Sequence, residues 1–232
     1  MKKLIFSITA ALLTVSVAFN ASAQTVTRSV SGYNGIASGG SFNVFVKIDG
    51  TEGVKLDVDA NIVDDIKTEV ENGILKVEFK DHWKNHRNIQ RANIYISAKT
   101  LSSLANSGSG NTTVDGVLTG ANARIALSGS GNIKTAVKSS TLDMRISGSG
   151  SIDVKGSTGL ADCHISGSGQ INGKSLNTET VEAAIAGSGD VSIAASKTVS
   201  ARIAGSGSVV YSGTATIGET RYAGSGRVSK VD

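Results

Sequence analysis

Apolar and polar residues alternate along short stretches of this chain, and the stretches are separated by a repeated tripeptide. In "DMRISGSGSIDV" (residues 143–154), Met144 and Ile146 precede Gly-Ser-Gly at alternate positions, and Ile152 and Val154 follow it in the same way. Alternation with a period of two places every second side chain on one face of a β-strand. The pattern therefore predicts two short strands joined by a Gly-Ser-Gly corner.

The tripeptide recurs seven times, at intervals of 18 to 21 residues. A near-constant period of this size is typical of a stacked repeat protein, in which each unit buries its apolar face against its neighbours. We predict that all of these glycines are structural corners. They are Gly108, Gly110, Gly129, Gly131, Gly148, Gly150, Gly167, Gly169, Gly187, Gly189, Gly205, Gly207, Gly224 and Gly226.

Alignment of the copies on their first glycine reveals apolar columns. The position two residues before that glycine holds Leu127, Ile146, Ile165, Ile185, Ile203 and Tyr222. About 19 residues at ~3.3 Å each give a path of roughly 60 Å, which is enough for one turn of a narrow coil that we expect to be three-sided. The fold class predicted is all-β, a β-solenoid with ladders of Ile and Val inside.

The position after the second glycine is polar in every copy. It holds Asn111, Asn132, Ser151, Gln170, Asp190, Ser208 and Arg227. Aspartate does not recur there, which argues against a calcium-binding roll. We expect a hydrogen-bonded polar ladder along the corners instead.

The first part of the chain has a different pattern. Residues 24–100 contain longer alternating strands such as "SFNVFVKI", with a hairpin signal at Asn72-Gly73 and a short helical turn expected around residues 61–66. A solenoid needs such a segment to cover its first rung. We expect one domain over residues 24–232, with this strand-rich part as a cap and repeats of about 19 residues over 101–232.

Residues 1–23 have the features of a secretory signal peptide. Two lysines precede an apolar run from Leu4 to Phe19, and Ala21-Ser22-Ala23 is a small-residue cleavage signal. The run is shorter than the ~20 residues needed to span a bilayer. We expect export to the periplasm, the cell surface or the medium, with no transmembrane segment in the mature chain. Cys163, the only cysteine, lies far from this junction, so we do not expect a lipoprotein.

Composition and charge narrow the function further. The chain has 28 glycines, no proline and a formal net charge of +4, of which Lys2 and Lys3 of the leader contribute two. The remaining +2 is too small to predict nucleic-acid binding. A lone cysteine excludes an intramolecular disulfide.

A cluster of aromatic and basic residues lies in "DHWKNHRNIQR" (residues 81–91). A tryptophan beside basic groups is suited to stack on a sugar or hold an anionic glycan, whereas a solvated hairpin tip is the simpler interpretation. Two histidines without a third ligand make a poor metal site, so we predict no metal and no cofactor. The candidate binding residues are His82, Trp83, Lys84, His86 and Arg87.

Carboxylates recur on the outer face of the repeats. Such a stack is also found in β-helical polysaccharide-cleaving enzymes, but here a basic residue follows most carboxylates at the next outward position. A salt-bridged surface is therefore expected, and Cys163, with His164 pointing to the opposite face, is expected in the core. We predict no catalytic residues. The acidic column is Asp143, Asp162, Glu182 and Glu219, and the basic column is Arg145, His164, Arg202 and Arg221.

The order of these elements resembles a known family. "YNGIASGGSFNVFVKIDGTEGVKLDVDANIVDDIKTEVENGILKVEFK", then "ANIYISAKTLSSLANSGSGN" and serial Gly-Ser-Gly corners, is similar to the GIN-domain family of autotransporter-type adhesin heads. The similarity covers nearly all of the mature chain. It departs at the Gly-Ile-Asn of the family name, which is Ser41-Phe42-Asn43 here. The resemblance implies a right-handed parallel β-helix and an exported, surface-associated role, and it supplies no catalytic residues.

Three functions are compatible with these observations. The first is a non-enzymatic exported interaction module, an adhesin that binds a surface carbohydrate or a cell-surface protein. The second is a carbohydrate-active enzyme that uses the outer carboxylates. The third is an envelope protein that forms homo-oligomers through exposed strand edges near residues 228–231.

Overall fold

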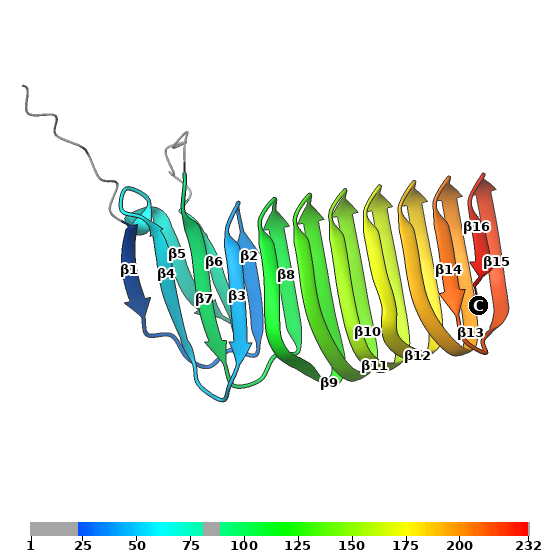
Figure 1. Ribbon diagram of the computed structural model, residues 1–232, viewed down its shortest axis with the longest axis horizontal. Helices are drawn as coiled ribbons and strands as arrows, with labels where there is room; N and C mark the ends of the chain where they lie inside the picture. Colours follow the sequence, from blue (N-terminus) through cyan, green and yellow to red (C-terminus); the bar gives the residue numbers. More distant parts are fainter. Residues whose placement is uncertain (1–22, 81–88, 232) are drawn as a thin grey trace, which may run out of the picture.

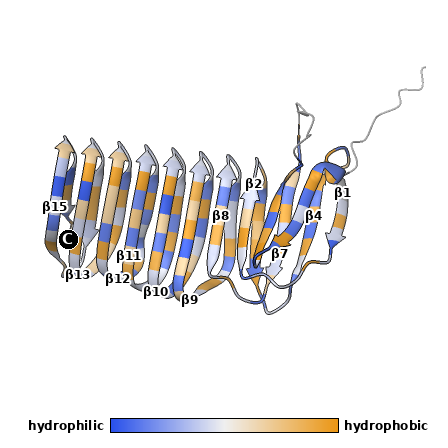
Figure 2. Cartoon of the chain, turned by 180° about the vertical axis from the view of Figure 1, so that it is seen from behind, coloured by the Kyte–Doolittle hydropathy of each residue, from blue (hydrophilic) through white to orange (hydrophobic). Residues whose placement is uncertain are grey.

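The computed structural model describes residues 23–80 and 89–231, and it is a right-handed β-solenoid (Figure 1). The chain ascends along the layer nearest the viewer in Figure 2, descends along the layer nearest the viewer in Figure 1, and advances by one strand spacing per turn. We call the outer surfaces of these two layers the ascending face and the descending face. The predicted all-β solenoid class is confirmed.

The repeats form long strands that pass through both layers. Adjacent turns pair in parallel and in register, so that Met144 lies opposite Cys163 and Gly148 opposite Gly167. The last complete turn is divided into β14 and β15, and β16 begins the turn that follows. The bounds are β9 Asn111–Gly129, β10 Asn132–Gly148, β11 Ser151–Gly167, β12 Gln170–Gly187, β13 Asp190–Gly205, β14 Ser208–Ser212, β15 Thr216–Gly224 and β16 Arg227–Lys230.

The cross-section has two sides, and our expectation of a three-sided coil was wrong. In β10 the inward residues Ile133 and Val137 belong to the descending arm, and Leu142 and Ile146 belong to the ascending arm. The arms are joined at one end by Gly-Ser-Gly and at the other by a bend near residues 139–141. The second bend has a different sequence in each turn, which is why the sequence pattern did not locate it.

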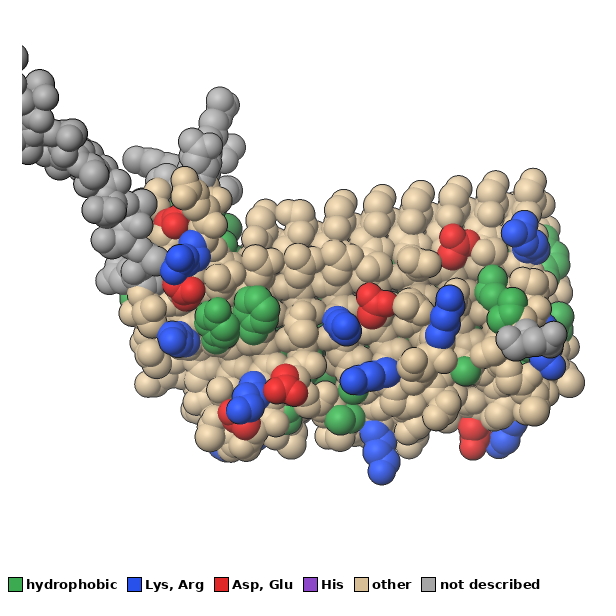
Figure 3. All heavy atoms as spheres, in the orientation of Figure 1, with side chains coloured by type: hydrophobic (Ala, Val, Ile, Leu, Met, Phe, Trp, Pro, Cys, Tyr) green, Lys and Arg blue, Asp and Glu red, His purple; other side chains and the backbone are tan. Residues whose placement is uncertain are grey.

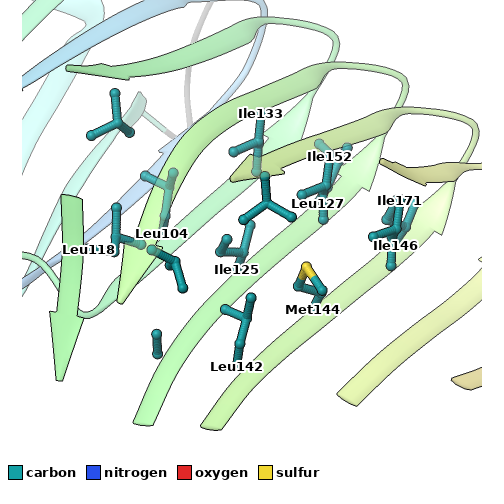
Figure 4. Packing of buried hydrophobic residues seen from close by; sticks show 14 of the residues in the cluster. Leu104, Leu118, Ile125, Leu127, Ile133, Leu142, Met144, Ile146, Ile152 and Ile171 are labelled. Atoms are coloured by element: carbon teal, nitrogen blue, oxygen red, sulfur yellow. The ribbon is translucent and has the colours of Figure 1, made fainter. Parts of the chain in front are cut away.

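Apolar ladders fill the space between the two layers (Figure 4). Ile133, Ile152, Ile171 and Val191 follow one another in consecutive turns, and each is fully buried. Burial of one such side chain contributes roughly 1.5–3 kcal/mol. Since each rung contributes several, the stability of the column comes mainly from stacking between turns.

The cap continues both layers with strands that are not in chain order. On the descending face, β1 Ala23–Arg28 pairs antiparallel with β4 Gly53–Asp59, β4 pairs with β7 Ala92–Ala98, and β7 pairs with β3 Asn43–Ile48, which joins β9. The ascending layer contains β5 Ile66–Glu71, β6 Ile74–Phe79, β2 Gly35–Gly39 and β8 Ser103–Gly108.

Two local predictions in the cap are confirmed. A 3-10 helix, η1 Val63–Asp65, lies inside the expected helical turn. Asn72 and Gly73 both have positive φ, at 51° and 76°, and join β5 to β6 as a hairpin. The Arg28 guanidinium ties β1 to this layer, because it donates to the carbonyl oxygens of Val63 at 2.9 Å and Ile66 at 2.5 Å.

Each Gly-Ser-Gly corner brings the backbones of neighbouring turns into close contact. Gly148 has φ +126°, and a Cβ atom there would lie 2.3 Å from the carbonyl oxygen of Gly129. A Cβ atom on Gly150 would lie 2.2 Å from the carbonyl oxygen of Gly131. Ser149, between them, is exposed. Both glycines are therefore required by the geometry of the corner.

The part of the chain described by the structure holds no helix with the length and apolar character of a membrane span.

Candidate functional site

The binding loop predicted from sequence lies outside the described residues. His82, Trp83, Lys84, His86 and Arg87 fall within residues 81–88, so their role stays a prediction. The described surface offers two other candidate regions, one on each face of the solenoid.

The ascending face has a long shallow groove of about 950 Å³. It runs across the strands from β6 and β2 to β15. Small residues form much of its floor, at the outward positions one or three residues before the first glycine of a corner. They include Ala105, Ser107, Ala126, Ser128, Ser147, Ser166, Ala184, Ala186, Ala204 and Ala223. In four turns the position three residues before the glycine instead holds a basic residue that also lines the groove, namely Arg145, His164, Arg202 or Arg221.

Charged side chains beside this groove form ion pairs within single strands. Arg145 Nε lies 2.9 Å from Asp143 Oδ1, and Arg221 Nη2 lies 2.7 Å from Glu219 Oε1. These contacts confirm the salt-bridged surface predicted from the alternating columns. Each exposed pair contributes only ~0–1 kcal/mol, so the pairs set local charge balance more than stability. Within the described chain, Glu182 is the carboxylate of this column that has no ion-pair partner.

The structure also brings together a Ser-His-Asp set that the sequence analysis did not recognise. Asp162, His164 and Ser166 project from one face of β11, and His164 Nε2 lies 2.9 Å from Asp162 Oδ1. No hydrogen bond joins His164 to Ser166 among the described residues. The backbone N–H of Ser168, in the adjacent corner, already donates to the Gly148 carbonyl at 3.0 Å. The set therefore lacks the contacts that activate a serine nucleophile.

Cys163 lies in the core, as predicted. It is fully buried between Met144 and Ala183 of the adjacent turns. Burial raises the pKa of its thiol, with smaller contributions from the negative charges of Asp162 and Asp143. A thiol held in its protonated form is a poor nucleophile, so Cys163 acts as a core residue.

An amide ladder lies along the descending face. Asn132 Nδ2 donates to Asn111 Oδ1 at 2.7 Å, and Ser151 Oγ donates to Asn132 Oδ1 at 2.7 Å. These contacts confirm the predicted polar ladder over the first three corners, and Ser208 Oγ donates to Asp190 Oδ1 further along the column. The ladder continues into the cap through Asn43 and Asn93, with Nδ2–Oδ1 distances of 3.4 Å at each step.

The first rung of this ladder has a modified corner. Gly40-Ser41-Phe42-Asn43 occupies the place that Gly108-Ser109-Gly110-Asn111 occupies one turn later, and Gly40 has φ +118°. Phe42 replaces the second glycine, so this turn lacks the Gly-Ser-Gly tripeptide. It shares the pattern Gly-Ser-x-Asn with the two corners that follow.

Two aromatic rings lie beside the amide ladder on the descending face. Phe45 on β3 and Tyr95 on β7 are register partners, with ring centroids 5.2 Å apart and ring planes inclined by 18°. Their side chains are 42% and 40% exposed. Figure 3 shows hydrophobic side chains together over β7 and β3, in the part of this face that belongs to the cap.

The residues around these rings complete a small block of side chains. Asn43 and Asn93 lie two positions before Phe45 and Tyr95 on the same strands, so all four point outward. We call these four residues the aromatic–amide block. Lys55 borders it on one side, with Nζ 6.0 Å from the centroid of the Tyr95 ring, and Thr113 borders it on the other side as the register partner of Phe45.

The fold and its outward surfaces define a capped, right-handed β-solenoid with polar ladders and no assembled catalytic centre among the described residues. The chain belongs to the family described as "Putative auto-transporter adhesin, head GIN domain", whose model matches residues 32–215. The family resemblance seen in the sequence is therefore confirmed.

Solved structures share this architecture. A "putative adhesin" from Bacteroides fragilis is 28% identical with a TM-score of 0.83, and the match covers 91% of this chain and 99% of that one. A "putative lipid binding protein" from Parabacteroides distasonis is 26% identical with a TM-score of 0.74, over 92% of this chain and 98% of that one. Comparison with curated proteins gives no match.

Proposed function

We propose that this protein is an exported, non-enzymatic adhesin module that binds a neutral glycan through the aromatic–amide block. The observation that carries the proposal is the exposure of Phe45 and Tyr95 beside the side-chain amides of Asn43 and Asn93. Isolated exposed apolar residues are common on protein surfaces, but an ordered pair of rings bordered by amides is a defined chemical surface.

The block has the chemistry that carbohydrate recognition needs. Aromatic rings provide a large, rigid apolar surface against which the C–H face of a pyranose packs. Amide groups both donate and accept hydrogen bonds, so Asn43 and Asn93 can pair with hydroxyl groups in either direction. Together with its borders Lys55 and Thr113, the aromatic–amide block extends over four neighbouring strands, a distance of roughly 14 Å at ~4.8 Å per strand. This length suits an oligosaccharide better than a single sugar.

The charge around the block favours a neutral ligand. Lys55 is close to the Tyr95 ring, while Asp57 lies in the amide row on the same strand and is paired with Arg91 at 3.3 Å. Positive and negative groups therefore alternate at this edge, and no single sign dominates. An anionic glycan would gain little net attraction there.

The absence of an enzymatic role is part of the proposal. Asp143 and Glu219 are ion-paired with Arg145 and Arg221 at 2.9 and 2.7 Å, and Asp162 lies 2.9 Å from His164 Nε2. These contacts disfavour the use of the three carboxylates as general acids and bases. The secretory features of residues 1–23 and the adhesin family support action outside the cytoplasm, either in the periplasm or at the cell surface.

A glycan array tests this function. The chain from residue 24 onward is applied to arrayed neutral and acidic oligosaccharides, and the strongest ligand is titrated by calorimetry. We expect a neutral oligosaccharide to bind and the double variant F45A/Y95A to bind at least tenfold more weakly. Val117→Ala is the matched control, because Val117 is equally exposed, at 43%, outside the block.

Several outcomes would contradict the proposal. Equal binding by the wild-type chain and F45A/Y95A would show that the ligand lies elsewhere, and the absence of any ligand on a broad array would remove the proposed function. Release of reducing ends from a polysaccharide, lost in the variant Asp162→Asn, would demonstrate an enzyme.

A lipid is the second candidate ligand. The groove of the ascending face has a floor of Ala and Ser that would accept an acyl chain, and one similar structure is described as a "putative lipid binding protein". Co-sedimentation with phosphatidylglycerol and phosphatidylcholine vesicles tests it. We expect Ala126→Glu to reduce vesicle binding if the groove is used and F45A/Y95A to leave it unchanged.

A further inference from the structure

The last turn of the solenoid leaves strand edges without partners in the described chain. Of its strands, β15 pairs only with β13, and β16 pairs only with β14. Both edges are at the end of the column opposite the cap (Figure 1). A row of unpaired backbone N–H and C=O groups is a ready template for another strand.

Apolar side chains gather at the same end. Ile217, Tyr222 and Val231 are 51%, 47% and 47% exposed, and they are three of the six large hydrophobic residues that are exposed in the described chain. Tyr222 is the register partner of Ile203, which is only 2% exposed. The end turn therefore continues the buried ladder but leaves its outer side open to solvent.

We propose that a second copy of this chain covers this end, joined by a two-fold axis normal to the two sheets. Such an axis places β15 antiparallel to β15 of the second copy. The ascending sheet then continues across the junction. A two-fold contact of this kind uses the same surface on both copies and closes after two, so it produces a dimer and not a filament.

The sequence of β15 is complementary to itself in this arrangement. With Thr220 at the axis, Glu219 lies opposite Arg221 of the second copy, and Arg221 lies opposite its Glu219. Opposite charges at facing positions stabilise an antiparallel pair, and like charges destabilise it. A parallel, in-register pair would instead set Glu219 against Glu219, so the charges favour the two-fold arrangement.

Dimerisation has a consequence for ligand binding. A two-fold axis normal to the sheets keeps both descending faces on the same side, with the two aromatic–amide blocks at opposite ends of a long, straight dimer. Two sites that face one surface bind it with an avidity well above the affinity of either. This consequence rests on the proposed function, whereas the pairing itself does not.

Sedimentation equilibrium in the absence of any glycan tests the dimer. We expect the chain from residue 24 onward to have twice its monomer mass at about 10–100 µM protein. Arg221→Glu sets like charges against each other at both facing positions, and we expect it to weaken dimerisation at least tenfold. The charge-swapped variant E219R/R221E restores opposite charges at both positions and should restore the dimer.

Controls separate dimerisation from folding and from ligand binding. Lys134→Glu, on the exposed descending face away from this end, should leave the dimer intact, and circular dichroism should show the same thermal melting profile in every variant of the set at a concentration where all are monomeric. A wild-type monomer over this concentration range would overturn the proposal. A dimer that resists Arg221→Glu, a charge swap that does not restore it, or a mass that grows beyond two copies would also overturn it. Because no glycan is present, failure here leaves the proposed function standing.

Discussion

Replacement of Gly148 by valine should destabilise the whole solenoid. Gly148 has φ +126°, a conformation that costs other residues roughly 1–3 kcal/mol. The new Cβ atom would also lie 2.3 Å from the Gly129 carbonyl oxygen, so the two turns must separate. Separation weakens the hydrogen bonds from Ser149 N and Gly150 N to that oxygen, now 2.9 and 3.1 Å long, at about 1 kcal/mol each.

The sum is roughly 3–5 kcal/mol, against a typical total stability of about 5–15 kcal/mol. For a chain of this length each kcal/mol lowers the melting temperature by roughly 2–4 °C, so we expect a fall of about 6–20 °C. Differential scanning calorimetry of the mature chain measures it. Ser149→Ala in the same corner is the matched control, because Ser149 is exposed, and it should stay within about 0.5 kcal/mol of wild type. Equal melting temperatures for Gly148→Val and wild type would refute the corner geometry.

Three further predictions concern other parts of the molecule. Arg28→Ala removes charged hydrogen bonds to the carbonyls of Val63 and Ile66, and urea unfolding should show a loss of about 2–3 kcal/mol, whereas Lys55→Ala should change stability by less than about 0.5 kcal/mol. Cys163 should resist dithionitrobenzoate at pH 8 until the chain is unfolded, because the thiol is buried and its pKa is raised; fast labelling of the native chain would contradict its position in the core. The hydrogen bond from Lys99, followed by those from the Gly32 and Tyr33 amides, lowers the pKa of Glu52 in the folded chain. The ionised Glu52 therefore stabilises the fold at pH values above its pKa in the unfolded chain, and this stabilisation is lost as pH falls through its pKa in the folded chain. Glu52→Gln should flatten the acid side of the plot of stability against pH, and an unchanged plot would contradict this contribution.

The repeat could be predicted from sequence because each turn contains the same local pattern. Alternation around Met144 and Ile146 assigns the inward columns, and the glycines assign one corner, without any knowledge of distant contacts. The second bend could not be located because no residue is common to it in all turns. Without its position, the path length of one repeat was assigned to three sides instead of two.

The aromatic–amide block could not be predicted in the same way. Phe45 and Tyr95 are fifty residues apart in the chain. They become neighbours only because β7 pairs directly with β3, although β4, β5 and β6 lie between these two strands in the sequence. Nothing in the local sequence of either strand indicates that partner. The sequence instead drew attention to residues 82–87, where aromatic and basic residues are adjacent in the chain, and that loop stays a prediction.

Nuclear magnetic resonance of the mature chain tests the central claim most directly. The ring signals of Phe45 and Tyr95 and the side-chain amide signals of Asn43 and Asn93 are followed while the strongest oligosaccharide from the array is added. We predict that these four residues show the largest shifts and that the signals saturate together at one affinity. Shifts confined to the alanine methyl groups of the ascending groove, or to residues 82–87, would contradict the proposal that the aromatic–amide block binds the glycan.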